Sequence, residues 1–122
     1  MFVVGTETDH VAPWPSVFKT YGLTRSFDYS FLLTSGGHNA GIVSGAVNPK
    51  RRHRVMHWNT PGDSSPAEFM ETAELRHGSW WPTWQQWLAR HSPAPKVAPP
   101  PLGNAAAGYP ALDDAPGQYV RG

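Results

Sequence analysis

Two short apolar runs near the start of the chain are the strongest structural signals in the sequence. Residues 1–4 (MFVV) and residues 29–34 (YSFLLT) are rich in aromatic and β-branched side chains, a composition typical of buried strands. Glycine stops the first run at Gly5, and the second ends shortly before Gly36. Because a helix-length segment separates the two runs, the pattern predicts a parallel βαβ unit and an α/β fold.

The segment between these strands predicts one short helix. Ser16 is placed to cap a helix over residues 17–21, and Gly22 is placed to end it. Trp14, in the preceding proline-containing turn, is more typical of packing at the base of a loop than of substrate contact. After the second strand, the small apolar residues 39–47 suggest a short helix or an irregular loop that packs closely on the sheet.

The middle of the chain predicts one edge strand and two helices. Val55, His57 and Asn59 alternate with Met56 and Trp58, as in an edge strand over residues 55–59. Ser65 followed by Pro66 and Glu68 is the pattern of a capping box, and it predicts a helix that runs to about His77. A second helix begins with Pro82 at its first position. Its large apolar side chains recur every three or four residues and predict a stripe that packs into the core: Trp81, Trp84, Trp87 and Leu88.

Candidate chemistry follows the two predicted strands. Asp9 lies just after the first strand and His38 just after the second. In open parallel sheets, functional groups gather at the carboxyl ends of neighbouring strands, so the carboxylate and the imidazole are expected to lie close together. A carboxylate that orients an imidazole makes it a better general base. The alternative is that Asp9 only caps its turn and His38 is an ordinary loop residue.

Four motifs carry a resemblance to a known family. Residues 5–14 (GTETDHVAPW) resemble the acid-bearing segment of the poly(3-hydroxyalkanoate) synthases, and residues 35–41 (SGGHNAG) resemble their histidine loop. Residues 78–82 (GSWWP) with the tryptophans that follow resemble their Trp-rich carboxyl-terminal segment. Residues 115–120 (APGQYV) resemble the ending of the class I enzymes. The motifs occur in order along almost the whole chain, which is similar only to the last part of such an enzyme.

The resemblance implies an α/β-hydrolase fold, of which this chain is the carboxyl-terminal part with a Trp-rich helical segment and a Pro-rich tail. It implies an enzyme that polymerises (R)-3-hydroxyacyl-CoA into polyester and releases CoA, with a Cys nucleophile, His38 and Asp9 as catalytic residues. The CoA thioester is the substrate, and no cofactor is expected. The resemblance also implies a homodimer, and association with cytoplasmic polyester granules and their coating proteins.

The absence of cysteine is the sharpest departure from the family. The chain has 122 residues and no cysteine, so the nucleophile is expected to lie outside it. The first strand also opens the chain directly, and two parallel strands alone cannot cover themselves. We therefore expect a fragment or a truncated gene product that is inactive by itself.

The dense basic run at residues 50–54 (KRRHR) holds the candidate substrate-binding residues Arg51 and Arg52. An anion site for the phosphates of CoA is one interpretation, and a solvated loop is the favoured one. His53 and His57 are four residues apart, but the surrounding sequence does not favour a helix, so no metal site is expected.

Composition limits the remaining function classes. A net charge of +1 gives no sign of a nucleic-acid partner, and no apolar run approaches the roughly 20 residues that a membrane helix needs. With no signal peptide at its start, a cytoplasmic protein of at most one domain is expected.

The sequence divides into three segments. Residues 1–48 carry the acid and the histidine, residues 49–91 carry the basic run and the Trp-rich helix, and residues 92–122 form the tail.

The tail, residues 92–122, changes in composition. Residues 92–101 (SPAPKVAPPP) predict an extended polyproline-type linker. Beyond it, Leu112, Tyr119 and Val120 are the apolar side chains expected to dock the arm on the rest of the protein.

Two other functions fit parts of the sequence. The acid turn and the histidine loop alone also suit a serine esterase or depolymerase with an α/β-hydrolase fold, although the Trp-rich segment and the ending disfavour it. The 6 tryptophans with the basic run also suit a noncatalytic binding module for a polymer surface, carbohydrate or RNA.

Overall fold

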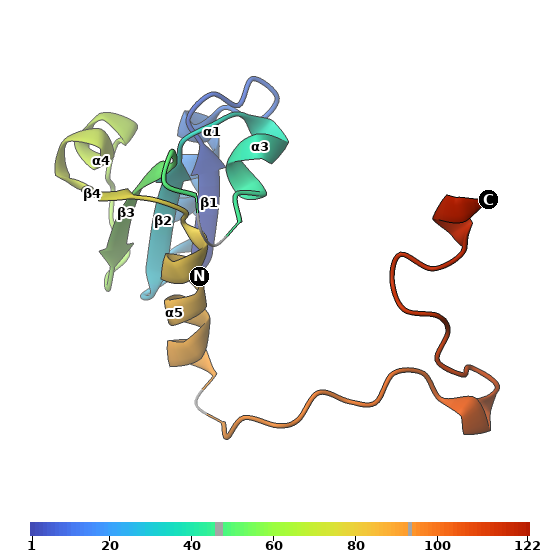
Figure 1. The fold of residues 1–122 in the computed structure, drawn as a ribbon. Helices are drawn as coiled ribbons and strands as arrows, with labels where there is room; N and C mark the ends of the chain where they lie inside the picture. Colours follow the sequence, from blue (N-terminus) through green and yellow to red (C-terminus); the bar gives the residue numbers. More distant parts are fainter. Residues whose placement is uncertain (46–47, 93) are drawn as a thin grey trace.

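A four-stranded sheet with helices on both faces forms the body of the protein (Figure 1). The structure is a computed structural model, and it describes residues 1–45, 48–92 and 94–122. The strands follow one another across the sheet in chain order. Their bounds are β1 Phe2–Thr6, β2 Tyr29–Thr34, β3 Arg52–Trp58 and β4 Glu74–His77.

The parallel pairing of β1 with β2 confirms the predicted βαβ unit. Val3 lies opposite Phe31 and Thr6 opposite Thr34 in this pair, so both strands end at the same edge of the sheet. The prediction of a mixed α/β fold is confirmed. The sheet then turns antiparallel, because β3 pairs antiparallel with β2 and β4 antiparallel with β3.

The strand predicted over residues 55–59 exists, but it is longer than expected and is not an edge strand. β3 begins at Arg52 and lies between β2 and β4, so the interpretation of the basic run as a solvated loop is wrong from Arg52 onward. The local pattern predicts helix for residues 74–77, but these residues form β4 and pair with the outer side of β3.

In the described ranges, five α-helices and two 3₁₀ turns connect or follow the strands. The segment after β1 forms two single-turn helices rather than one helix over residues 17–21, and Ser16 does not cap either of them. The first helix instead begins after Pro13, without a side-chain cap. The bounds are α1 Trp14–Phe18, α2 Thr20–Thr24, α3 His38–Ile42, α4 Pro66–Thr72 and α5 Trp81–His91, with η1 Ala105–Ala107 and η2 Tyr119–Arg121.

The predicted start of α4 is confirmed, but its predicted end is wrong. The Ser65 hydroxyl accepts a hydrogen bond from the Glu68 backbone N–H at 3.1 Å, which satisfies one of the free donors at a helix start. The helix ends at Thr72, and Ala73 has extended backbone angles. The next four residues pair with β3, Leu75 opposite Arg54, so pairing with a distant strand overrides the local preference for helix.

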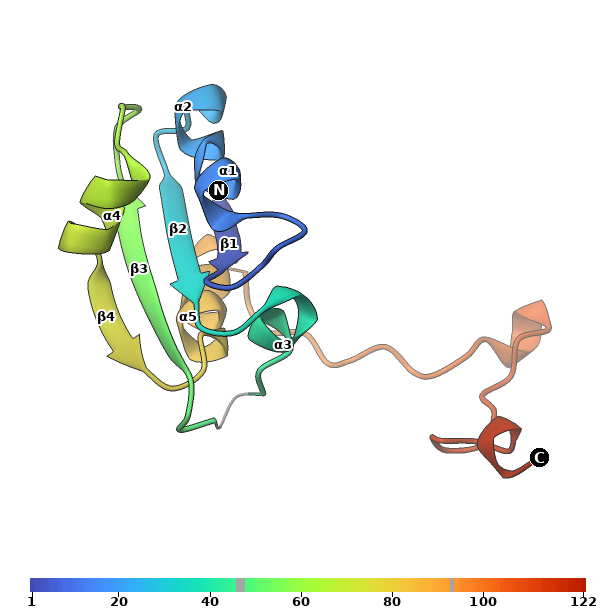
Figure 2. The ribbon, with the colours of Figure 1, turned by 90° about the horizontal axis from the view of Figure 1, so that it is seen from above.

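Alternate residues of β2 define the two sides of the sheet. Tyr29, Phe31 and Leu33 face the aromatic core with α1, α2 and α4, where Phe18 and Phe69 pack on them. The centroids of the Phe18 and Phe31 rings are 5.0 Å apart in an edge-to-face arrangement, which aromatic pairs favour. Trp14 belongs to this group, as its predicted packing role requires. Figure 2 shows α5 on the opposite side of the sheet.

The Trp stripe of α5 is only partly a core feature. Trp87 packs on Phe2 with ring centroids 5.5 Å apart, but Trp84 and Leu88 are exposed. The prediction that the whole stripe packs into the core is therefore wrong for those two residues. Pro82 lies one position further into the helix than predicted, because the helix begins at Trp81.

The tail does not dock on the body. Residues 94–122 run away from the sheet (Figure 1), and Tyr119 is 96% exposed, with Leu112 and Val120 also exposed. These side chains are therefore not docked on the sheet and helices that the structure describes, and their docking stays a prediction, whereas residues 95–101 form neither helix nor strand, as expected of an extended linker. Pro93 of that linker, and residues 46 and 47 of the segment predicted after His38, lie outside the described residues. No helix in the described ranges combines the length and apolar character that crossing a membrane requires.

Candidate active site

Asp9 lies in a tight turn that follows β1 and leaves one carboxylate oxygen free. Its Oδ1 accepts hydrogen bonds from the backbone N–H groups of Val11 at 2.8 Å and Ala12 at 2.9 Å. Such turns form because an Asp side chain can bond to the backbone a few residues on. The other oxygen, Oδ2, is thereby aimed away from the turn.

His38 is the first residue of α3, at the end of the loop after β2. Gly36 has a φ of +107°, a conformation that disfavours any side chain, and Gly37 is the residue before the helix. Gly41 lies so close to β1 that a Cβ there would meet the Thr6 side chain at 2.5 Å. Backbone bonds from Glu7 to Thr34 and from Thr8 to Gly36 join this loop to the Asp9 turn.

The two side chains meet as the sequence predicts. His38 Nδ1 lies 3.0 Å from Asp9 Oδ2. The Asp9 side chain is 10% exposed and the His38 side chain 51% exposed. The pKa of Asp9 falls to about 2, chiefly because its carboxylate accepts the Ala12 backbone N–H and next because it faces His38. The carboxylate is therefore ionised at neutral pH and accepts a hydrogen bond from Nδ1–H of His38.

This arrangement leaves Nε2 of His38 as the basic nitrogen. With the proton on Nδ1, Nε2 carries a lone pair, and the ring is half-exposed. Within the described ranges, Nε2 has no protein hydrogen-bond partner. An imidazole whose tautomer is fixed by a carboxylate is chemically suited to accept a proton from a nucleophile or a hydroxyl group.

Arg51 and Arg52 also lie at this edge of the sheet, but their side chains contact protein atoms. Arg51 donates from Nη1 to the Ser35 carbonyl at 3.1 Å and from Nη2 to the Ala40 carbonyl at 2.7 Å. Arg52 pairs with Glu7 at 2.9 Å. Arg54, which points elsewhere, donates to the Ala73 carbonyl at 3.1 Å.

Two tryptophans hold the far end of α3, which the sequence did not indicate. The indole N–H of Trp81 donates to the Ile42 carbonyl at 2.9 Å, and that of buried Trp80 lies 3.2 Å from the Gly41 and Ile42 carbonyls. These carbonyls are the unpaired acceptors at the end of a helix. The spacing of the tryptophans predicted core packing and carried no sign of this contact.

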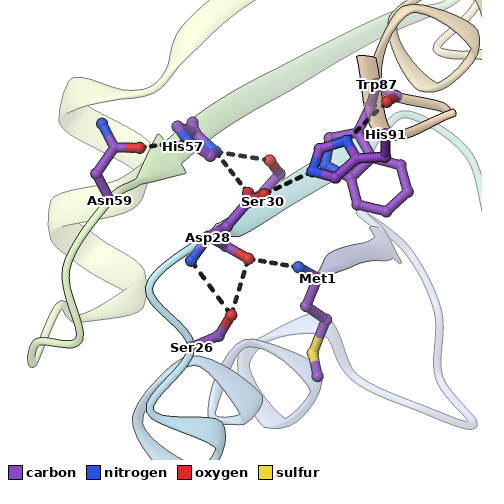
Figure 3. A network of polar contacts seen from close by, with 8 residues as sticks. All are labelled: Met1, Ser26, Asp28, Ser30, His57, Asn59, Trp87 and His91. Atoms are coloured by element: carbon purple, nitrogen blue, oxygen red, sulfur yellow. Dashed lines mark hydrogen bonds and ion pairs between the residues drawn. The ribbon is translucent and has the colours of Figure 1, made fainter. Parts of the chain in front are cut away.

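A second cluster of acid and histidine side chains lies at the other end of β2 (Figure 3). Asp28 Oδ2 is 2.6 Å from His91 Nε2, and Asp28 Oδ1 is 3.7 Å from His57 Nδ1. The same His57 Nδ1 lies 2.9 Å from the Ser30 hydroxyl, while His57 Nε2 faces Asn59. Because Ser30 and Asp28 meet one nitrogen, the ring cannot pass a proton between them. The cluster therefore holds β2, β3 and α5 together.

His53 and His57 contact different protein groups. His53 contacts the Gly78 carbonyl and the Thr83 hydroxyl, whereas His57 contacts Ser30 and Asn59. In the part of the chain that the structure describes, no three side chains are arranged to hold a metal ion.

Comparison with known proteins relates nearly the whole chain to one group of enzymes. No profile of a known protein family matches the sequence. The Poly(3-hydroxyalkanoate) polymerase subunit PhaC of Cupriavidus necator is 36% identical over 121 residues, which cover 98% of this chain and 19% of that protein. Poly(3-hydroxyalkanoate) polymerase 2 of Ectopseudomonas oleovorans is 35% identical over 119 residues, covering 98% and 20%.

A third relative gives the same result. The Poly(3-hydroxyalkanoate) polymerase subunit PhaC of Rhizobium etli is 34% identical over 123 residues, which cover 98% of this chain and 18% of that protein. The chain thus spans about a fifth of the length of these relatives. Over nearly its whole length, the chain is homologous to a carboxyl-terminal part of the poly(3-hydroxyalkanoate) polymerase family.

Proposed function

We propose that this chain is the acid-and-histidine segment of a polymerase that converts (R)-3-hydroxyacyl-CoA into polyester and releases CoA. The observation that supports it most is the 3.0 Å contact between His38 Nδ1 and Asp9 Oδ2. The contact lies at the carboxyl ends of two neighbouring parallel strands, where α/β sheets place their chemistry. The parallel pair with helices on both faces suits the last part of an α/β-hydrolase fold.

The proposed reaction uses a cysteine from outside this chain. His38 Nε2 takes the proton of the Cys thiol, and the thiolate attacks the thioester carbonyl of the substrate. The bond between the carbonyl carbon and the CoA sulfur breaks, and CoA leaves with the proton from His38. The 3-hydroxyl group of another unit then attacks the acyl-enzyme, which forms the ester and returns the Cys thiol.

Asp9 has two possible roles in this reaction: to orient His38, or to help activate the 3-hydroxyl group. Its Oδ1 is occupied by two backbone N–H groups and its Oδ2 by His38. Both oxygens are thus engaged, which supports the orienting role. In that role the carboxylate also stabilises the imidazolium that forms when His38 takes a proton.

The substrate and the assembly complete the proposal. Of the two arginines considered for the CoA phosphates, Arg52 is the better candidate because its side chain is 54% exposed.

We further propose a homodimer of the complete polymerase, located in the cytoplasm on polyester granules with their coating proteins. Without a cysteine, the 122-residue chain alone should release no CoA from 3-hydroxybutyryl-CoA.

The test uses the intact polymerase that carries this segment. His38→Ala should abolish formation of the acyl-enzyme, measured as covalent labelling by a radioactive 3-hydroxyacyl-CoA and as CoA release. Asp9→Asn should slow acylation and elongation together if Asp9 only orients His38, and elongation alone if it activates the hydroxyl group. His10→Ala is the matched control, because His10 is an exposed neighbour of Asp9. Normal acylation by His38→Ala would refute the proposed role.

A further inference from the structure

Arg51 spans the loop that carries His38. Its two terminal nitrogens donate to the carbonyl groups of Ser35 and Ala40, one on each side of His38 in the sequence. The loop and the first turn of α3 are therefore tied at two points to the residue that precedes β3. A guanidinium group is suited to this because its N–H donors diverge in one fixed plane.

The loop is shaped to receive this side chain. A Cβ at Gly36 would collide with Nη1 of Arg51, and Gly36 has a φ of +107°, which side chains rarely adopt. The Ser35 backbone N–H also donates to the Arg52 carbonyl at 2.9 Å, and the Arg52 N–H donates to the Ser35 hydroxyl at 3.1 Å. The start of β3 and the histidine loop thus form one bonded unit.

We propose that Arg51 is a positioning residue that holds the His38 ring with Nδ1 on Asp9, rather than a binding residue for the CoA phosphates. Its role in catalysis rests on the proposed function, because it acts through His38. Both ends of its guanidinium group already have protein acceptors, and moving it onto a phosphate would release the loop. A displacement of about 1 Å in a catalytic group is enough to cost up to about 100-fold in rate.

The first test needs no enzymatic activity. Imidazole ¹⁵N shifts of the full 122-residue chain at pH 8.5, well above the pKa of free imidazole, report which nitrogen of His38 carries the proton. The unchanged chain should hold the proton on Nδ1. Arg51→Gln should shift the population toward the Nε2–H tautomer, and Arg51→Lys should give an intermediate result because its point-like ammonium suits one carbonyl at a time.

The matched control is Arg54→Gln, which removes a guanidinium-to-carbonyl contact to Ala73 from a neighbouring position within β3. It should leave the His38 tautomer unchanged even if it lowers the melting temperature. An unchanged tautomer in Arg51→Gln would overturn the proposal, and so would an equal shift in Arg54→Gln. Circular dichroism of each variant identifies any that fail to fold, and Arg51→Lys then provides the decisive comparison.

The second test uses the intact polymerase. Arg51→Gln should lower kcat by about 10- to 100-fold and change KM for the CoA thioester by less than about twofold, with partial recovery in Arg51→Lys. A raised KM with normal kcat is the signature of a lost substrate contact and would overturn the positioning role. If the proposed function itself is wrong, His38→Ala remains active in the same assay, whereas the tautomer experiment still judges Arg51 independently.

Discussion

At the scale of single residues, the two carboxylate oxygens of Asp9 have separate roles. Oδ1 closes the turn by accepting hydrogen bonds from two backbone N–H groups, and Oδ2 accepts a hydrogen bond from Nδ1–H of His38. These three hydrogen bonds fix the position of the Asp9 carboxylate, although the turn around it is largely exposed. Most of the depression in the pKa of Asp9 therefore comes from groups within three residues of it and from one imidazole.

The lowered pKa of Asp9 predicts a particular acid response. The pKa is about 2 in the folded protein against an ordinary value of 3.8, so its contribution to stability is complete above about pH 4 and is lost as the pH falls through about 2. Asp9→Asn should therefore flatten the dependence of the free energy of unfolding on pH between 4 and 2, because its amide oxygen keeps the turn but does not titrate. Urea unfolding at several pH values measures this.

The control for that experiment is Asp114→Asn, a change in the exposed tail. It should keep the pH dependence of the unchanged chain. If the free energy of unfolding changes equally with pH in Asp9→Asn and in the unchanged chain, the Asp9 carboxylate does not make the hydrogen bonds that lower its pKa.

At the scale of elements, close packing of α3 on β1 places His38. A Cβ at Gly41 would lie 2.5 Å from Thr6 Cγ2 and 3.0 Å from Thr6 Cβ, and Thr6 is buried in the sheet. Gly41→Ala should therefore push α3 outward and lower the free energy of unfolding by about 1–3 kcal/mol. Urea denaturation gives this value.

A second glycine substitution tests whether contact with Thr6 causes the loss of stability expected for Gly41→Ala. Gly22 lies within α2, and a Cβ there would meet nothing within 4 Å. Gly22→Ala should stabilise the protein by about 0.5–1 kcal/mol through helix preference alone. A loss for Gly22→Ala as large as that for Gly41→Ala would show that contact with Thr6 is not what makes Gly41 necessary.

The end of α5 is fastened by an ion pair that depends on pH. The hydrogen bond to Asp28, and next the contact with the Trp87 carbonyl, raise the pKa of His91, and the same bond lowers the pKa of Asp28. The Met1 amino group and His57 also face Asp28. The pKa of His91 is raised in the folded state. The contribution of His91 to the stability of the protein is therefore complete below the ordinary pKa of 6.5, and it disappears as the pH rises through the raised pKa.

The melting temperature of the unchanged chain should fall between pH 6 and pH 9. The fall should be smaller in His91→Gln, which lacks the titrating imidazole. Differential scanning calorimetry at the two pH values measures it, with His10→Gln as the control for an exposed histidine outside the cluster. A pH dependence that is identical in His91→Gln and the unchanged chain would place its origin in another group.

At the scale of the whole molecule, the body and the tail are separate in their contacts. The hydrogen bonds described within the tail join its own residues, Asn104 with Tyr109 and Gln118 with Asp113. Its side chains are almost all exposed, and Figure 2 shows it leaving the body beyond α5. The tail is thus free to contact other surfaces, and the body should not depend on it.

Removal of residues 93–122 should therefore leave the melting temperature of the body within about 2 °C of the full chain, because a shift of that size corresponds to well under 1 kcal/mol for a domain of this size. Calorimetry on the two chains makes the comparison. A much lower melting temperature for the shortened chain would mean that the tail stabilises the body through contacts that the structure does not describe.

The sequence by itself determined the features that depend on neighbours along the chain. The buried strands β1 and β2 follow from their apolar runs, the cap at Ser65 from four adjacent residues, and the meeting of Asp9 with His38 from the order of strand, crossover and strand. These are local or topological consequences, because side-chain preference and the geometry of a parallel crossover act over short stretches.

Only the tertiary structure decided the features that depend on distant partners. Residues 74–77 become β4 because β3 offers a free edge for pairing, although the sequence before them predicts helix. Arg51 reaches the histidine loop because β3 returns beside β2. Trp84 and the apolar side chains of the tail stay exposed because, among the residues that the structure describes, no element covers them. Hydrophobicity states what a side chain prefers, but the presence of a surface to cover it is decided only when the whole chain is folded.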